Sequence, residues 1–214
     1  MSTKNKFKQL LFSKTASDSL TVLAGSGVSS LLGFIFVFIT ARALGPAQFG
    51  IFSTVINYVV FLSAVIDLGI SQSLVKFAHE SDTEEDKKKW FSTSLYIVSI
   101  LSVAGSLIFA LLYQLILRNI WHHSENYAIQ ILLIIFVITL NIFFLGFFQS
   151  IRQFLKRSIY DASFSIIRIL IILLVMLLAK ISTVWGLWSI IFAYSLTLIA
   201  GLWVSKSYFQ KKER

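Results

Sequence analysis

Six long apolar stretches run through this 214-residue chain and leave too little sequence between them to build a water-soluble core. A helix that crosses a bilayer core of about 30 Å needs roughly 20 apolar residues, because it rises about 1.5 Å per residue. Each stretch is long enough, so we predict a membrane-spanning helix from each. The predicted spans are Leu20–Thr40, Ile51–Ser71, Phe91–Leu117, Ala128–Ser150, Ser163–Ala179 and Gly186–Ser205.

Positive charge is concentrated in alternate gaps between these stretches. Of the 19 lysines and arginines, fifteen lie in one set of segments, three lie in the other set, and Arg168 lies inside a span. Cationic loops stay on the cytoplasmic side of a membrane, so this pattern predicts two cytoplasmic termini and an even number of crossings. All five tryptophans lie at or near predicted span ends, where amphipathic rings prefer the interface.

The expected fold class is an all-α integral membrane protein with six transmembrane helices. Its predicted parts are a basic cytoplasmic N-terminal segment (1–19), a six-helix lobe (20–205) with a cytoplasmic loop at 72–90, and a basic cytoplasmic tail (206–214). A mean hydropathy of +0.80 excludes an ordinary soluble domain. The net charge of +9 comes from short juxtamembrane clusters, so we expect contact with anionic membrane lipids and no nucleic-acid partner.

Motifs for catalysis are absent from the sequence. There is no Gly-x-x-x-x-Gly-Lys-Ser/Thr loop for ATP and no His-Glu-x-x-His zinc motif. The chain has no cysteine, which excludes thiol catalysis and thiolate metal sites. His122 and His123 lie beside Glu125 on a predicted external loop, where we favour ordinary exposed residues over a metal site. We therefore expect neither an enzyme nor a bound cofactor or metal.

Small residues recur every four positions in the first span, at Gly25, Ser29 and Gly33 and again at Ser26 and Ser30. Such a face lets two helices approach closely in lipid, where no hydrophobic force draws them together. Two interpretations stay open. The face either packs directly against another helix or lines a transport cavity.

The first two spans are joined by a Gly45-Pro46 pair that contains the only proline of the chain. The residue before a proline avoids the α region, and proline suits the first turn of the next helix, so we predict a tight external turn. The second span then ends with Asp67-Leu-Gly-Ile-Ser71.

Two strings in this region resemble the polysaccharide-exporter family, the Wzx-type oligosaccharide flippases of the multidrug/oligosaccharidyl-lipid/polysaccharide exporter superfamily. They are Arg42-Ala-Leu-Gly-Pro-Ala-Gln-Phe-Gly-Ile-Phe-Ser53 and Asp67-Leu-Gly-Ile-Ser-Gln-Ser-Leu-Val-Lys-Phe77. The family pattern is an arginine–hydrophobic–Leu-Gly–Pro stretch, a Tyr/Phe-Gly pair, and an Asp-Leu-Gly that ends the second helix. Spans three to six match the family in hydropathy and order rather than by motif.

The resemblance implies a substrate and a mechanism. The substrate is a lipid-linked oligosaccharide repeat unit on a polyprenyl pyrophosphate, moved between leaflets of a bacterial-type cytoplasmic membrane by alternating access between two six-helix lobes. Family members have about twelve or more helices, so this chain corresponds to one N-terminal lobe. Either two copies pair, or a separate second lobe completes the transporter, or the chain is an inactive truncated product. Lobes of the family are related by an axis along the membrane normal, which allows a parallel homodimer.

Arg168 is the first candidate for recognition of the pyrophosphate, because an ionisable residue inside a span is costly and usually functional. Asp161, Ser165 and Arg168 share one helical face, which predicts an inward polar stripe. Arg168 lies only about 10 Å along the axis from the predicted cytoplasmic end of its span, so snorkelling or a structural tie to Asp161 is the alternative.

Four further residues are weaker candidates. Arg42, at the outer end of the first helix, is a possible receiver of the pyrophosphate or an ordinary interfacial cation. Asp67 is the candidate for coupling to protons or sodium, with capping or pairing near the membrane face as the alternative. The span amides Asn57 and Asn141, and with them Gln149, are candidates for sugar hydroxyls, although such groups more often hydrogen-bond between helices.

Two other functions compete with flipping. A multidrug or small-solute exporter of the same superfamily would need buried carboxylates for coupling, and only Asp67 comes near to that role. A non-transporting scaffold would recruit polysaccharide-assembly enzymes through the acidic and basic loop at 72–90.

Overall fold

The computed structural model describes residues 14–81, 83–117, 126–178 and 182–212. Within these ranges the chain is helical, with no strand, which confirms the predicted fold class. The elements are α2 (Lys14–Asp67), α3 (Ile70–Glu80), α4 (Glu84–Leu112), the π-helical turn η1 (Tyr113–Leu117), α6 (Ala128–Ser150), α7 (Phe154–Leu178) and α8 (Thr183–Lys212). Arg118, Lys180, the His122–His123 pair and most of the predicted N-terminal segment lie outside the described residues.

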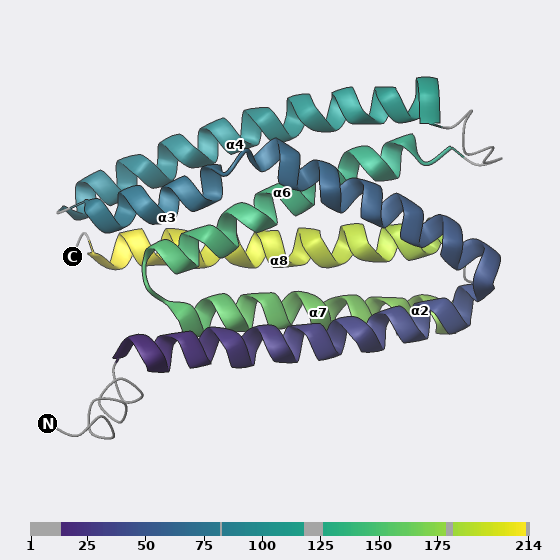
Figure 1. Cartoon of the computed structure of the whole chain (residues 1–214), viewed down its shortest axis with the longest axis horizontal. Coiled ribbons are helices and arrows are strands. Elements are labelled where there is room, and N and C mark those ends of the chain that lie inside the picture. The colour runs from purple at the N-terminus through teal and green to yellow at the C-terminus, as the bar shows by residue number, and fades with distance from the viewer. Residues whose placement is uncertain (1–13, 82, 118–125, 179–181, 213–214) are drawn as a thin grey trace, which may run out of the picture.

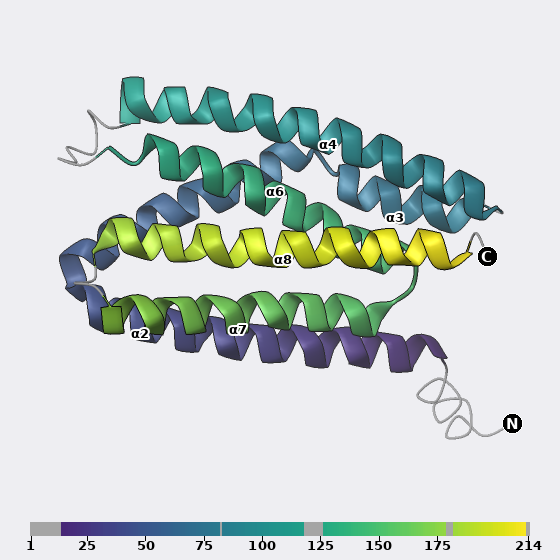
Figure 2. The same ribbon diagram turned by 180° about the vertical axis from the view of Figure 1, so that it is seen from behind.

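The helices lie roughly side by side along one long axis (Figure 1). At one end of this bundle α2 begins, α3 meets α4, α6 meets α7, and α8 ends (Figures 1 and 2). We call it the basic end, because most cations of the described residues gather there, whereas Arg42 and Arg168 lie elsewhere. Among those at the basic end are Lys76, Lys87–Lys89, Arg152, Lys156, Arg157 and Lys206.

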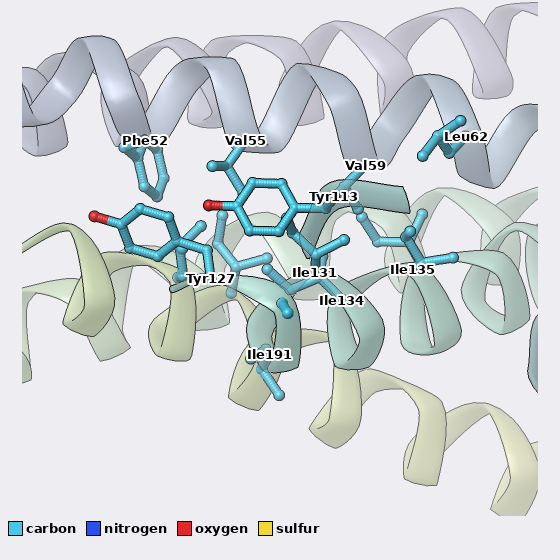
Figure 3. Close-up of a cluster of buried hydrophobic side chains, with 14 of the residues drawn as sticks. Phe52, Val55, Val59, Leu62, Tyr113, Tyr127, Ile131, Ile134, Ile135 and Ile191 are labelled. Carbon is cyan, nitrogen blue, oxygen red and sulfur yellow. The ribbon is translucent and has the colours of Figure 1, made fainter. Parts of the chain in front are cut away.

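The helix α6 forms the centre of the bundle. It contacts each of the other α-helices. In its apolar stretch of 18 residues 72% of the residues are buried, against 11% in the corresponding stretches of α2 and α7. A hydrophobic cluster holds the second half of α2 against it, with Phe52, Val55 and Val59 facing Ile131 and Ile134 (Figure 3). A second cluster joins α3, α4, α6 and α7, and its buried members are Leu74, Phe91, Val98, Leu140, Phe143, Phe144, Phe147, Phe148 and Tyr160.

The predicted external turn is a sharp bend inside a continuous helical run. Gly45 adopts φ 71° and ψ 169°, and helical geometry resumes at Pro46. The apolar part of α2, Ser19–Asp67, has 49 residues and would measure about 70 Å if straight, more than two bilayer cores. Instead α2 reverses at the bend and runs back toward the basic end (Figure 1).

Among the described residues, five helices are long and apolar enough to cross a membrane, and α2 is one of them. Its two halves, which we call the first limb (Lys14–Leu44) and the second limb (Pro46–Asp67), correspond to the first two predicted spans. The count of six crossings and the cytoplasmic position of both termini stay predictions.

The segment 72–90, predicted as a cytoplasmic loop, is helical over residues 72–80 and 84–90. Most of it belongs to α3 and to the first turns of α4. Leu74 and Ala78 are buried one helical turn apart, and Phe77 stacks on Trp90 with ring centroids 4.7 Å apart. The Thr83 hydroxyl caps α4 by accepting from the Asp86 N–H at 3.1 Å. The loop prediction gave weight to the run of charges. It did not use the apolar spacing of α3 or the Thr-x-x-Asp pattern that marks the first turn of a helix.

We expect Gly45→Ala to destabilise the protein by about 1–3 kcal/mol, because only glycine adopts this combination of φ and ψ without strain. Thermal unfolding in detergent measures the change. The matched control is Gly50→Ala, since Gly50 is helical and a Cβ there meets no atom within 4 Å. That substitution should stabilise by about 0.5–1 kcal/mol. Equal melting temperatures for the two variants would contradict the role of the bend.

Candidate functional site

Arg168 lies near the middle of α7, deeper than its sequence position suggested. The helix begins at Phe154 rather than at the predicted Ser163. Arg168 is therefore about 21 Å along the axis from the first residue of α7 and about 15 Å from Leu178, at 1.5 Å per residue. These are distances to the ends of the helix, so snorkelling stays the alternative interpretation for the guanidinium.

The guanidinium of Arg168 is enclosed by α2 and α7. Its Cζ lies 4.7 Å from the ring centroid of Phe36 and 4.9 Å from that of Phe164. Its Nη2 lies against Gly33, where an added Cβ would approach to 2.8 Å. Phe164 in turn stacks on Tyr194 of α8, with centroids 3.9 Å apart. Two cation–π contacts away from water, each worth up to about 2 kcal/mol, offset much of the cost of a charge in the membrane.

The charge of Arg168 has no anionic partner in the described part of the chain. No acidic side chain there forms an ion pair with it, and its Nε is buried without a hydrogen-bond partner. Asp161 lies two helical turns away on α7 and acts on it only over a distance. The guanidinium can therefore accept an anion from outside the lobe.

The small-residue face of the first limb packs directly against α7. An added Cβ at Gly25 would overlap the Ser158 hydroxyl, which donates to the Thr21 carbonyl at 3.3 Å. Farther along, the Ser165 hydroxyl donates to the Ser29 carbonyl at 3.5 Å. The interpretation as a packing face is thus confirmed at Gly25 and Ser29. At Gly33 the same lack of a side chain makes room for the guanidinium of Arg168.

Asn141 is buried in α6 at the junction with α7 and α8. Its Nδ2 donates to the Val137 carbonyl at 2.7 Å and to the Tyr194 carbonyl at 3.1 Å. Its Oδ1 accepts from the Tyr160 hydroxyl at 2.5 Å and the Thr197 hydroxyl at 2.9 Å. These four bonds fill the capacity of an amide, which supports an interhelical role for Asn141 over contact with a sugar.

Asp67 is buried at the break between α2 and α3. Its Oδ1 accepts from the Ser71 hydroxyl at 2.5 Å, and Ser71 lies against Gly146 of α6. Leu68 and Gly69 both have positive φ there, at 47° and 76°, so the helical hydrogen-bond ladder is interrupted. A buried carboxylate can take up a proton or contribute an oxygen ligand to a hard cation.

Arg42 and Asn57 are exposed and are not brought together with Arg168. Arg42 follows Gly33 by nine residues on the first limb, about 13 Å farther along the axis. Asn57 lies on the exposed side of the second limb. The five candidates therefore occupy separate places in the lobe, and their substrate and coupling roles stay predictions.

A cavity of about 600 Å³ opens at the basic end, and of its lining residues sequence reasoning named only Gln149 as a candidate. Arg152, counted there only as a charge that orients the protein, is one of the residues that line it. The positive φ of Arg152, 56°, has no sequence signature, because glycine normally marks such a position.

Together these features define a multi-pass membrane protein in which Arg168 has no anionic partner among the described residues. The chain belongs to the polysaccharide biosynthesis protein family, which matches residues 16–214. No curated protein matches it.

The fold is similar to that of a multidrug resistance MATE family transporter of the MOP superfamily, solved in an outward-facing conformation. The TM-score is 0.70 at 18% sequence identity, over 86% of this chain. The chain spans 42% of the length of that transporter. Family membership places the chain among polysaccharide biosynthesis proteins, and the likeness to the transporter shows a shared fold.

We expect Asn141→Ala to lower stability by about 1–2 kcal/mol, because the Tyr160 hydroxyl and the Tyr194 carbonyl lose a buried partner. Thermal unfolding of the purified chain measures this. Asn57→Ala is the control, since an exposed side chain should change stability by less than about 0.5 kcal/mol. An Asn141→Ala protein as stable as the control would show that the three interhelical bonds of Asn141 do not hold α6, α7 and α8 together.

Proposed function

We propose that the chain forms one lobe of a flippase for lipid-linked oligosaccharide repeat units in a bacterial-type cytoplasmic membrane. The observation that carries this proposal is the mid-span guanidinium of Arg168, held by Phe36 and Phe164 without an anionic partner in the described residues. Membership of the polysaccharide biosynthesis protein family supports the substrate class.

The physical reason lies in the cost of moving a pyrophosphate through lipid. An isolated anion in a medium of low dielectric constant is very unfavourable, so the path needs a cation at intermediate depth. Arginine suits phosphate because its planar fork donates two parallel hydrogen bonds. In the empty lobe the two aromatic rings stabilise this cation, and the pyrophosphate takes up its free hydrogen-bonding capacity when it arrives.

The other candidates take supporting roles in this proposal. Arg42, at the opposite end of the first limb from the basic end, receives the pyrophosphate as it leaves the centre. Asn57 offers an exposed amide to sugar hydroxyls. Asp67, at the α2–α3 break, is the residue that couples transport to protons or sodium.

Alternating access needs a second wall for the pathway, supplied by a second copy of the chain or by a separate lobe. The similar MATE transporter is more than twice as long as the matched part, which supports an arrangement of two lobes. The protein mass of the purified complex, with detergent and lipid subtracted, tests the homodimer. We expect two copies of the 24.2 kDa chain. A single copy would mean that a different polypeptide supplies the second lobe or that the chain is inactive alone.

A multidrug exporter is the second candidate, because the fold is shared with a multidrug resistance transporter. Exporters of cationic drugs need buried carboxylates, whereas the centre of this lobe carries a cation. The charge at Arg168 therefore favours an anionic substrate.

The test is Arg168→Met, which removes the charge but keeps an unbranched side chain between the two rings. We expect flipping of a polyprenyl-pyrophosphate oligosaccharide by the full chain in proteoliposomes to fall about 10- to 100-fold. This range corresponds to the loss of charge-assisted hydrogen bonds worth about 1.5–3 kcal/mol. The melting temperature should stay equal or rise, because the cost of the buried charge disappears.

A purely structural role for Arg168 predicts the opposite pattern, with lower stability and unchanged transport per folded molecule. Lys156→Met serves as the charge-matched control, since Lys156 is an exposed cation at the basic end. If transport survives in Arg168→Met and export fails only when Glu85 and Lys87–Lys89 are neutralised, the scaffold interpretation replaces the flippase.

A further inference from the structure

The cavity at the basic end is built by three elements of the fold. The start of α2 contributes Ser19, Val22, Leu23 and Ser26, the end of α6 contributes Gln149, and the α6–α7 connection contributes Arg152 with the first residue of α7, Phe154. Its volume of about 600 Å³ lies within the range of small-molecule sites.

Arg152, which lines this cavity, has a backbone conformation that residues other than glycine rarely adopt. It closes α6 in the left-handed region at φ 56°, with its N–H donating to the Gln149 carbonyl at 3.0 Å. The next N–H, of Gln153, donates to the Phe148 carbonyl at 3.0 Å, which completes a helix end of the type that glycine usually occupies. Glycine would make the same two bonds without strain, so the backbone gives no reason for an arginine here.

The lining combines donors of hydrogen bonds with an apolar wall. The Arg152 guanidinium, the Gln149 amide and the hydroxyls of Ser19 and Ser26 can all donate, and none of the described lining residues is acidic. Phe154 begins a helix of 25 residues, whose first N–H groups add partial positive charge at the same place. Val22 and Leu23 supply the apolar side. This set fits an amphiphile with an anionic phosphate head.

We propose that this cavity binds the phosphate head of a membrane lipid through Arg152, and that the lipid is the polyprenyl carrier of the substrate. The identity of the carrier rests on the proposed flippase function, whereas the phosphate site itself does not. The same two helices that border the cavity, the first limb of α2 and α7, continue to Gly33 and Arg168. Arg152 thus holds the phosphate at the basic end, about 21 Å along α7 from the central cation, counted from Phe154.

The decisive variant is Arg152→Gly, which removes the cation and relieves the backbone at once. Binding of undecaprenyl phosphate to the full chain in detergent, followed by native mass spectrometry, should weaken at least about tenfold. The melting temperature should rise by about 2–4 °C, because glycine tolerates the left-handed conformation. Arg152→Lys should keep most of the binding without the gain in stability.

The matched control is Lys156→Ala, which removes another exposed cation at the basic end that does not line this cavity. It should bind undecaprenyl phosphate as the unchanged chain does. Unchanged binding in Arg152→Gly would overturn the proposal and leave Arg152 as a charge that orients the protein. An equal loss in Lys156→Ala would also overturn it, because the effect would then come from net charge.

Phosphatidic acid carries the same phosphate head on a different lipid. It therefore distinguishes the polyprenyl carrier from an ordinary membrane lipid as the ligand of the cavity. Tighter binding of undecaprenyl phosphate than of phosphatidic acid supports the carrier, whereas equal binding of both overturns the carrier assignment and keeps the phosphate site. Since the readout is binding, it needs no transport. Failure of the flippase proposal at Arg168 and failure of the Arg152 site are therefore distinguishable.

Discussion

The first limb of α2 approaches α7 so closely that hydroxyl groups of one helix reach carbonyl oxygens of the other. Lipid tails are as apolar as the helix surfaces, so no hydrophobic force draws two helices together. Helix pairs depend instead on van der Waals contact and on such hydrogen bonds. Gly25 and Ser29 give α7 this approach, and Ser158 and Ser165 complete it. The same contact fixes where Phe36 and Gly33 meet Arg168. The position of the central cation thus follows from the packing of two helices.

Buried polar groups in this lobe fall into two kinds. Asn141 makes four hydrogen bonds, one within α6 and three to α7 and α8, so it connects three helices. Arg168 has an unpartnered Nε and aromatic rings around it, an environment that tolerates the charge but leaves it open to an anion. Both are polar residues inside apolar runs, so hydropathy alone assigns them the same significance. Only the count of their partners separates a structural group from a functional candidate.

Hydropathy and charge alternation predicted the helical membrane fold and the order of the helices, because span length and apolar content are properties of local sequence. The helical parts of 72–90 were not predicted, since Leu74 lies among charges and its burial depends on the aromatic rings of α4 and α6. The early start of α7 was missed for a similar reason, because Lys156 and Arg157 precede its apolar part. The backbone of Arg152 could not be predicted, since it arises from how α6 ends against α7.

The bend at Gly45 has a mechanical consequence. A span joined to the next by a flexible loop can slide or tilt independently, whereas the two limbs of α2 meet at a single residue between continuous helices. The two limbs form a V-shaped bracket joined at Gly45, so a displacement of one limb also displaces the other. A change in the angle between this bracket and α3 would then occur at Leu68 and Gly69, the next interruption along the chain. That joint lies beside Asp67, so protonation or ion binding there would act at the pivot of the bracket.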